Sequence, residues 1–346
     1  MPKHKVGVVG GTGYTGAELV RLLINHPDVN LEIITSRSHA GKPFSDVHPH
    51  FTGMADMELQ TIDDLDDYEL DLVFLALPHG VSMDFIDKHF DENIRMIDLS
   101  GDFRLTSAES YKKWYGKKHS SPDFISKAAF GLPELFRDQI RNATLVANPG
   151  CYPTSAILAL APLLKSDLIK PDDIVIDSKS GVTGAGAKAS AKTHFPDVFG
   201  NFSAYGLRNH RHTPEIQQAL QQFTQAEEPR VIFTPHLLPI DRGILTTTYS
   251  TPKKATTDEL VQKMIARFYE KEHFVRIANN PPQVKYVRGS NYCDLHATYD
   301  ERTNKIITVS TIDNLVKGAA GQAVQNMNIM FGMLEHTGLR ITPLSP

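Results

Sequence analysis

The residues best suited to covalent chemistry lie in the stretch NPGCYPT, residues 148–154. It holds Cys151, one of only two cysteines in the chain of 346 residues. Gly150 leaves room for close approach, and Pro153 favours the first turn of a helix. The free N–H groups of a helix N-terminus stabilise a thiolate and lower the pKa of the thiol. Position alone leaves two interpretations open, a nucleophile and a buried inert thiol. Cys293, inside a strand-like run, has no comparable setting.

The segment NHRHTPEI, residues 209–216, offers a proton partner for such a thiol. His210 and His212 precede a sequence typical of a helix start, and Glu215 is placed to orient an imidazole. The residue pattern does not separate the two histidines as acid and base. A cysteine with two histidines is also a known zinc ligand set, but no second cluster of ligands accompanies it, and we expect no metal.

A glycine-rich loop, GGTGYTG at residues 10–16, lies between an apolar strand and a helix. Its G-x-x-G-x-x-G spacing allows a tight turn and a close approach of the backbone to a pyrophosphate, which the helix N-terminus then attracts. The sequence therefore predicts a dinucleotide site. Its expected contacts are Gly10, Thr12, Gly13, Tyr14, Thr15 and Gly16.

The end of the second predicted strand indicates which dinucleotide is bound. An acidic residue there would bind the ribose 2′-OH of NAD, but this strand ends in Ser36, Arg37 and Ser38. A guanidinium with two hydroxyls suits a 2′-phosphate. We therefore expect NADP(H).

Two patterns of secondary structure must position these residues. In the first half, apolar strands without polar alternation are separated by helices, which predicts a parallel sheet covered on both faces. The predicted strands are 5–9, 31–35, 71–77 and 95–100, with helices over 15–26 and 81–90 and a loop over 38–54. In the second half, strands that follow one another closely predict an antiparallel or mixed sheet in an α+β domain. Its predicted strands are 173–181, 230–240, 243–250, 291–300 and 305–313, with helices near 154–165, 214–224 and 257–271. One long helix is expected over 314–333.

Composition excludes several classes of partner. The formal net charge of −4 provides no basic field for a nucleic-acid backbone. Apolar runs are too short to span a bilayer, and the start MPKHKVGVVGG is unlike a signal peptide. Two cysteines cannot form a disulfide framework. We therefore expect a cytoplasmic protein that binds neither nucleic acid nor membrane.

Taken together, the motifs resemble the N-acetyl-γ-glutamyl-phosphate reductase family, NADPH-dependent reductases of arginine biosynthesis. The resemblance runs in order from about residue 5 to the C-terminus. It rests on GGTGYTGAELVRLL, FLALPHG, DLSGDFRL, NPGCYPT, SGVTGAGAK, NHRHTPEI, TPHLLPIDRGI and NLVKGAAGQAVQNMN. It implies an α/β fold: a Rossmann dinucleotide-binding domain joined to an α+β glyceraldehyde-3-phosphate-dehydrogenase-like catalytic domain. The implied domains are 1–148 with 314–346 for NADP binding, and 149–313 for catalysis and oligomerisation, in a homodimer or homotetramer.

The resemblance also implies roles for particular residues. Cys151 would attack the carbonyl of a small-molecule acyl phosphate, NADPH would reduce the resulting thioester, and His210 rather than His212 would move the proton. His212 and Glu215 would orient the site. Further cofactor contacts are expected at Pro78, Gly184, Asn314, Gly318 and Gln322, and substrate contacts at Arg104, Ser180 and Lys188.

Two alternatives remain open from the sequence. Some relatives perform the same chemistry on an aminoadipyl phosphate carried by a protein in lysine biosynthesis, and one extra methylene is worth only ~1–3 kcal/mol in a pocket. A non-catalytic NADP-binding redox sensor using Cys151 is the other, but it leaves the histidine segment without a role. Aspartate-β-semialdehyde dehydrogenase shares the reaction type, but its cysteine block differs from NPGCYPT.

Overall fold

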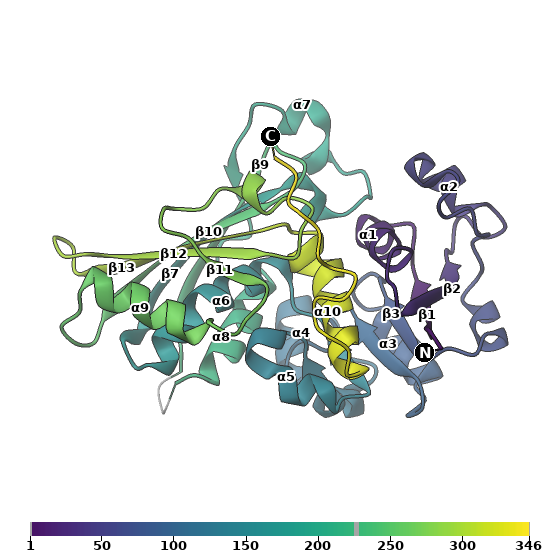
Figure 1. Ribbon diagram of the computed structural model, residues 1–346, viewed down its shortest axis with the longest axis horizontal. Coiled ribbons are helices and arrows are strands. Elements are labelled where there is room, and N and C mark those ends of the chain that lie inside the picture. Colours follow the sequence, from purple (N-terminus) through teal and green to yellow (C-terminus); the bar gives the residue numbers. More distant parts are fainter. Residues whose placement is uncertain (1, 225–227, 346) are drawn as a thin grey trace. The chain divides into compact units, whose positions relative to one another are not determined.

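The computed structural model describes residues 2–224 and 228–345, and these divide into two compact units (Figure 1). The first unit comprises the chain up to Pro149 together with Ala319–Arg340, and the second comprises Gly150–Gly318 and the residues from Ile341. None of the described helices is long and apolar enough to cross a membrane.

These limits differ from the predicted ones at the C-terminal side. The prediction returned the chain to the first domain at residue 314, but residues 314–318 belong to the second unit. Asn314 holds them there, because its Oδ1 accepts the backbone N–H of Gly243 at 2.7 Å. The prediction also placed the last residues in the first domain. Instead they belong to the second unit, where the N–H of Leu344 donates to the carbonyl of Arg288 at 2.9 Å.

The first unit is built on a parallel sheet with the strand order β2-β1-β3-β4-β6-β5. Its strands are β1 (His4–Val9), β2 (Val29–Thr35), β3 (Leu72–Leu75), β4 (Arg95–Asp98), β5 (Ala128–Phe130) and β6 (Leu145–Ala147). Its helices are α1 (Tyr14–Leu23), α2 (Phe44–Val47), α3 (Ser82–His89), α4 (Ala108–Tyr115), α5 (Pro133–Arg141) and α10 (Gly321–Met330). The strand order reverses between β1 and β3, which is the arrangement of a Rossmann fold.

Both faces of this sheet are covered, as the unalternating apolar strands predict. On β2, Ile33 packs in a cluster with Met83 and Phe85 on one face, and the next residue, Ile34, packs with Val20 of α1 on the other. Because successive strand residues point to opposite faces, two adjacent buried isoleucines require two covered faces.

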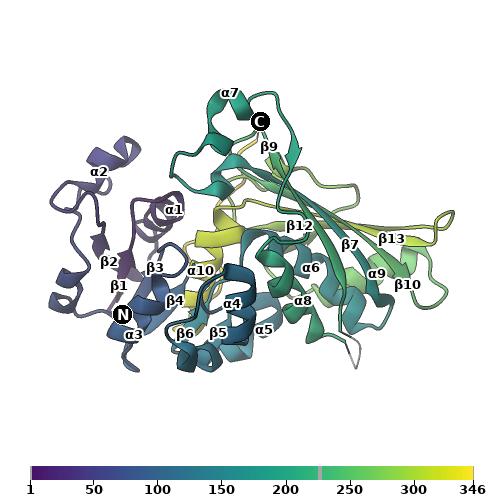
Figure 2. The same cartoon turned by 180° about the vertical axis from the view of Figure 1, so that it is seen from behind.

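The second unit contains a mixed sheet with the strand order β11-β12-β13-β10-β7-β9-β8. The pairs β7·β9 and β11·β12 are parallel, and the other pairs are antiparallel. Its strands are β7 (Ile169–Gly181), β8 (Ser203–Ala204), β9 (Val231–Leu238), β10 (Ile244–Pro252), β11 (Val275–Ile277), β12 (Cys293–Asp300) and β13 (Lys305–Ile312). Its helices are α6 (Cys151–Lys165), α7 (Phe195–Val198), α8 (His212–Gln221) and α9 (Asp258–Phe268). Figure 2 shows α6, α8 and α9 on the same side of this sheet.

Three predicted elements differ from the structure in ways that matter for the site. Helix α6 begins at Cys151 itself, three residues before the predicted start. The long helix predicted over 314–333 is a π-helical turn, Val316–Ala320, followed by α10. The segment predicted as a loop over 38–54 contains α2 and a 3₁₀ turn, because Phe44 and Phe51 are both buried and fix the chain between them.

Candidate active site

The glycine loop follows β1 in the first unit and is shaped by its glycines. Gly10 has φ +83°, and a Cβ there would fall 2.7 Å from the carbonyl oxygen of Ala76. A Cβ on Gly16 would fall 2.6 Å from the carbonyl oxygen of Gly10. Side chains at these two positions would push the loop away from β3 and from the first turn of α1. The loop therefore keeps a tight turn that only glycine permits.

The N-terminus of α1 suits an anion. Gly13 is its N-cap and has no side chain to cap the helix, and a Cβ there would meet nothing within 4 Å. The first N–H groups of a helix lack intrahelical acceptors and carry a partial positive charge. Space and donors thus coincide where a pyrophosphate would bind, so the loop fits a dinucleotide.

The three residues expected at a 2′-phosphate lie at the carboxyl end of β2. Ser36 is buried, with its Oγ 3.2 Å from Oγ1 of Thr12 in the glycine loop. Arg37 and Ser38 are exposed. Arg37 directly follows the residue that contacts the glycine loop, and its exposed side chain is accessible to a ligand.

Two further loops meet at the same carboxyl edge. Pro78 lies in the turn between β3 and α3, and Asp102 closes this turn by accepting the N–H of Gly80 at 2.8 and 2.9 Å. Arg104 is buried and donates from Nε to the carbonyl of Asn148 at 2.7 Å and from Nη2 to that of Leu99 at 2.8 Å. These bonds make Arg104 a support of the chain entering residues 149–151.

Gln322 contributes an unusual group to the first unit. It lies in α10 and is fully buried, and neither Nε2 nor Oε1 has a hydrogen-bond partner among the described residues. A buried amide without partners is costly, about 1–3 kcal/mol per group. Such a side chain is suited to a polar ligand that supplies the missing partners.

In the second unit, Cys151 is the first residue of α6. Gly150 is the N-cap with φ −66° and ψ 156°, and no side chain caps the helix. The thiol forms no disulfide and is half-buried. Its place at the positive end of a largely buried helix lowers the pKa of a thiol.

Glu215 and His212 of α8 lie next to Gly150, the residue before Cys151. Glu215 is fully buried, and its Oε1 accepts the N–H of Gly150 at 2.7 Å. A Cβ on Gly150 would fall 2.8 Å from Cε1 and 2.9 Å from Cδ2 of His212, and closer still to its Nε2. The structure therefore brings His212 and Glu215 together at the cysteine turn.

His210 is held differently from His212. Its Nδ1 accepts the backbone N–H of His212 at 3.2 Å, and its ring packs edge-on against Tyr152 and Phe233. Burial, together with the charge of Arg211, lowers the pKa of His210 to about 4. His210 is thus a neutral ring that shapes the segment. No cluster of three or more His, Cys, Asp or Glu side chains within the described ranges is arranged to hold a metal ion.

Two tyrosines that were not among the predicted site residues lie near the thiol. The hydroxyl of Tyr152 donates to the carbonyl of His236 at 3.1 Å and lies 3.0 Å from the hydroxyl of Tyr205. Burial raises the pKa of both phenols, that of Tyr205 to about 12, and a negative charge on Cys151 raises them further. Tyr152 follows the cysteine directly and could have been noticed. Tyr205 lies 53 positions away, and its neighbours in the sequence carry no signal.

Of the other predicted residues of the second unit, Ser180 and Asn314 are buried and Lys188 is exposed. Ser180 is buried at the end of β7, and a Cβ on Gly184 would fall 3.0 Å from its Oγ. Asn314 donates from Nδ2 to Oγ1 of Thr183 at 3.0 Å, besides its bond to Gly243. Lys188 is exposed.

Gly318 lies directly against the cysteine. A Cβ on Gly318 would fall 2.7 Å from Cβ and 3.2 Å from Cα of Cys151. Its N–H donates to the carbonyl of Asp313 at 3.0 Å, a bond that spans five residues and opens the π-helical turn. The resemblance assigns Gly318 to the cofactor, whereas its observed neighbour is the cysteine.

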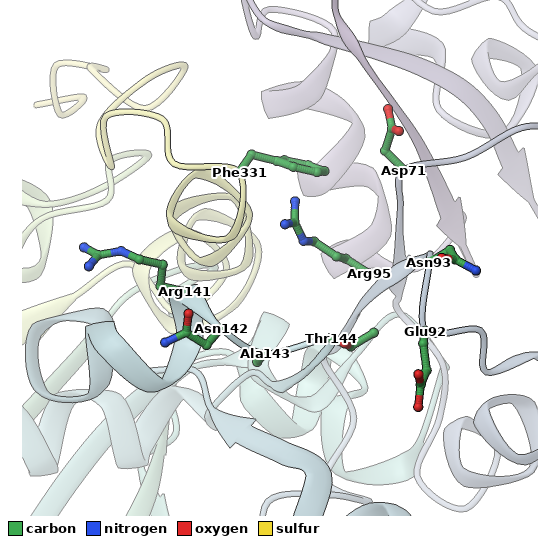
Figure 3. A pocket seen from close by; sticks show the side chains of 9 residues that line it. All are labelled: Asp71, Glu92, Asn93, Arg95, Arg141, Asn142, Ala143, Thr144 and Phe331. Atoms are coloured by element: carbon green, nitrogen blue, oxygen red, sulfur yellow. The ribbon is translucent and has the colours of Figure 1, made fainter.

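A hollow of about 480 Å³ in the first unit lies away from these residues, at the amino ends of β4 and β6 (Figure 3). Arg95 lies in it with its guanidinium 4.6 Å from the centre of the Phe331 ring. The side chains of Arg141 and Asp71 point away from Arg95 in Figure 3. The hollow lies at the edge of the sheet opposite the glycine loop.

Comparisons with known proteins agree with this division. Residues 5–143 match the family model described as semialdehyde dehydrogenase, NAD binding domain, and residues 151–314 match semialdehyde dehydrogenase, dimerisation domain. The first unit thus carries a nicotinamide-dinucleotide-binding domain. The chain is also similar in fold to the aspartate semialdehyde dehydrogenase II of Vibrio cholerae in complex with ASA, with a TM-score of 0.73 and 17% identity over 96% of this chain and 99% of that chain.

Closer relatives identify the family. An N-acetyl-γ-glutamyl-phosphate reductase of Desulfotalea psychrophila is 49% identical over 99% of this chain and 99% of its own length. Those of Desulforamulus reducens and Methanosphaera stadtmanae are each 47% identical, over 99% and 100% of both chains respectively. Identity at this level along the whole length, on a chain with a dinucleotide loop and a helix-end cysteine, shows that the protein belongs to the N-acetyl-γ-glutamyl-phosphate reductase family of oxidoreductases.

Proposed function

We propose that this protein reduces N-acetyl-γ-glutamyl phosphate with NADPH to N-acetylglutamate 5-semialdehyde and phosphate, in arginine biosynthesis, as a cytoplasmic homodimer or homotetramer. The observation that carries the proposal is the setting of Cys151: a thiol at the start of α6, with the ring of His212 and the carboxylate of Glu215 against the residue before it. The names of the full-length relatives support the substrate.

The first chemical step uses this chain's own residues. His212 accepts the proton of the Cys151 thiol, and the thiolate attacks the carbonyl carbon of the acyl phosphate. A carbon–sulfur bond forms, the carbon–oxygen bond to phosphate breaks, and inorganic phosphate leaves with its electron pair and takes up one proton from water. The product is a thioester on Cys151. The free N–H groups of α6 favour the thiolate in this step.

NADPH, when bound, supplies the hydride that lowers the thioester to the oxidation level of the aldehyde. When the carbon–sulfur bond then breaks, the sulfur leaves as a thiolate and the aldehyde is released. The proton held by the imidazolium of His212 can return to this sulfur, which restores the starting state. The Cys151 thiol and the His212 ring thus exchange one proton in each direction during a turnover.

We assign the proton transfers to His212, although the resemblance favours His210. The ring of His212 lies against Gly150, while the Nδ1 of His210 is occupied by the backbone N–H of His212. A pKa of about 4 also makes His210 a weak base near neutral pH. His210 then acts as a positioning residue, and Glu215 positions the cysteine turn through Gly150.

For the cofactor, we propose that the glycine loop holds the pyrophosphate and that Ser36, Arg37 and Ser38 hold the 2′-phosphate of NADPH. Pro78 and Gly184 would border the site. The unpartnered buried amide of Gln322 supports a direct polar contact. The side-chain amide of Asn314 is hydrogen-bonded to Gly243 and Thr183, which supports a positioning role.

For the substrate, we propose a contact with Ser180, which is buried at the end of β7. The bonds of Arg104 to two backbone carbonyls support a positioning role for it. Lys188 is exposed, and a phosphate contact would require its side chain to turn toward the substrate.

The assay in the reverse direction tests the proposal. The protein is given NADP⁺, phosphate and N-acetylglutamate 5-semialdehyde, and formation of NADPH is followed by its absorbance. The one-carbon-longer aldehyde is tested beside it. We expect turnover with the shorter aldehyde, none for C151S, and at least a hundredfold loss for H212N with a smaller loss for H210N. Full activity of C151S would refute the mechanism, and preference for the longer aldehyde would refute the substrate.

A further inference from the structure

The segment between β2 and β3 replaces a regular crossover helix with a compact aromatic turn. Phe44 and Phe51 are buried, their ring centres are 5.0 Å apart, and they pack in one cluster with Val20 of α1. Backbone bonds fix the segment further, since the N–H of Phe44 donates to the carbonyl of Met57 at 2.9 Å. The segment is therefore a fixed part of the first unit, although the sequence pattern predicts only a loop.

This segment reaches the glycine loop through one side chain. Nε2 of His48 lies 3.2 Å from the carbonyl oxygen of Thr12. A carbonyl oxygen only accepts, so Nε2 carries the hydrogen in this contact. The ring is held in place by its neighbours, 5.0 Å from Phe44 and 6.4 Å from Phe51 between ring centres. Burial lowers the pKa of His48, which favours a neutral ring with a single N–H.

Fixing the carbonyl of Thr12 also fixes the N–H of Gly13. The two groups belong to the same planar trans peptide and point in opposite directions. Gly13 is the N-cap of α1, at the site where we propose that the pyrophosphate binds. Because Gly13 has no side chain, its φ is less restricted than that of other residues, and an anchor on the carbonyl of Thr12 limits rotation of this peptide.

We infer that His48 is a positioning residue for the dinucleotide: by holding the carbonyl of Thr12, it aims the N–H of Gly13 at the pyrophosphate. This inference rests on the proposed function, because it requires that a dinucleotide binds at the glycine loop. The pyrophosphate is common to NADPH and NADH. His48 therefore sets the affinity for both, whereas Arg37, proposed at the 2′-phosphate, acts on NADPH alone.

Direct binding to the full-length protein tests this inference. The dissociation constants of NADPH and NADH are measured by isothermal titration calorimetry for the native protein, H48A, H48Q, H50A and R37A. H48Q retains an N–H donor at about the position of Nε2. H50A is the matched control, because His50 is exposed in the same turn, with its ring centre 4.4 Å from that of Phe51.

We expect H48A to weaken binding of NADPH and NADH by the same factor, about three- to tenfold, the loss of one hydrogen bond. H48Q should regain most of this affinity, H50A should bind like the native protein, and R37A should weaken NADPH only. With saturating NADPH, kcat of H48A should be unchanged while KM for NADPH rises.

Different failures have different meanings. If the native protein binds neither dinucleotide, the proposed function fails and the inference falls with it. If the native protein binds and H48A binds equally well, only the inference is overturned. A loss in H48A that H48Q does not restore, accompanied by a fall in melting temperature, would show that His48 merely packs the aromatic turn and would also overturn it.

Discussion

Replacement of Gly150 by alanine tests the contact between the cysteine turn and His212. The new Cβ would lie 2.8 Å from Cε1 of His212, whereas carbon atoms in good contact are about 3.5 Å apart. The ring therefore has to retreat by at least about 0.7 Å. Since a misplacement of about 1 Å costs on the order of a hundredfold in rate, we expect kcat to fall about ten- to a hundredfold, roughly 1.4–2.7 kcal/mol.

The fold should tolerate this change. Gly150 has φ −66° and ψ 156°, which alanine adopts freely. Alanine is a poorer N-cap residue than glycine, and this exchange costs roughly 0.5–1 kcal/mol. G150A should therefore keep its melting temperature within a few degrees and bind NADPH like the native protein. Activity is measured with saturating substrates, so that kcat reports the active-site geometry.

A double-mutant cycle provides the decisive control. If the added methyl acts by displacing the ring, G150A should cause little further loss in a protein that already carries H212A, because no ring remains to be displaced. The reasoning is refuted if G150A is fully active. It is equally refuted if G150A lowers kcat by the same factor with and without His212.

Further predictions concern Gly318, Asp98 and the thiol. G318A places a Cβ 2.7 Å from Cβ of Cys151. We expect kcat to fall at least tenfold and the rate of alkylation by iodoacetamide to change, while the affinity for NADPH stays the same. A loss of NADPH affinity alone would instead indicate that Gly318 contacts the cofactor. Burial, with the charge of Asp102, raises the pKa of the fully buried Asp98 to about 6 from 3.8. The contribution of Asp98 to stability is therefore full below about pH 4 and is lost as the pH rises through 6. In urea unfolding, the free energy of unfolding of the native protein should fall by roughly 2–3 kcal/mol relative to D98N between pH 4 and pH 7. A difference between the two proteins that does not change with pH would contradict this. Alkylation of Cys151 should show a thiol pKa below the usual value of about 8.5, and a value at or above it would remove the helix effect.

The predicted fold rests on patterns that local physics enforces. Unalternating strands such as residues 31–35 require a sheet covered on both faces, and the buried pair Ile33 and Ile34 fulfils that requirement. The helical turns within residues 38–54 could not be predicted in this way. They form because Phe44 and Phe51 pack against α1, a contact that no local propensity encodes. Tertiary packing overrode a sequence that is rich in turn formers.

The candidate site shows the same limit. The N-terminal position of Cys151 is legible from Gly150 and Pro153, since helix starts have local signals. Which histidine ring lies against Gly150 is not, because His210 and His212 are two residues apart and their difference arises from burial among distant side chains. The pairing of Tyr152 with Tyr205 likewise depends on how α6, β9 and the chain before α8 come together.

The hydrogen bond between the N–H of Gly150 and the carboxylate of Glu215 links the two groups that carry out acyl transfer. It fastens the nucleophile's turn to α8, the helix that also carries His212, so thiol and imidazole move as one body. Every residue of this body lies within Gly150–Gly318. Acyl transfer is therefore separable from reduction. Mixed with acyl phosphate but no nicotinamide cofactor, the enzyme should release a rapid burst of phosphate that stops near one equivalent per chain, leaving a population of acylated enzyme poised for reduction.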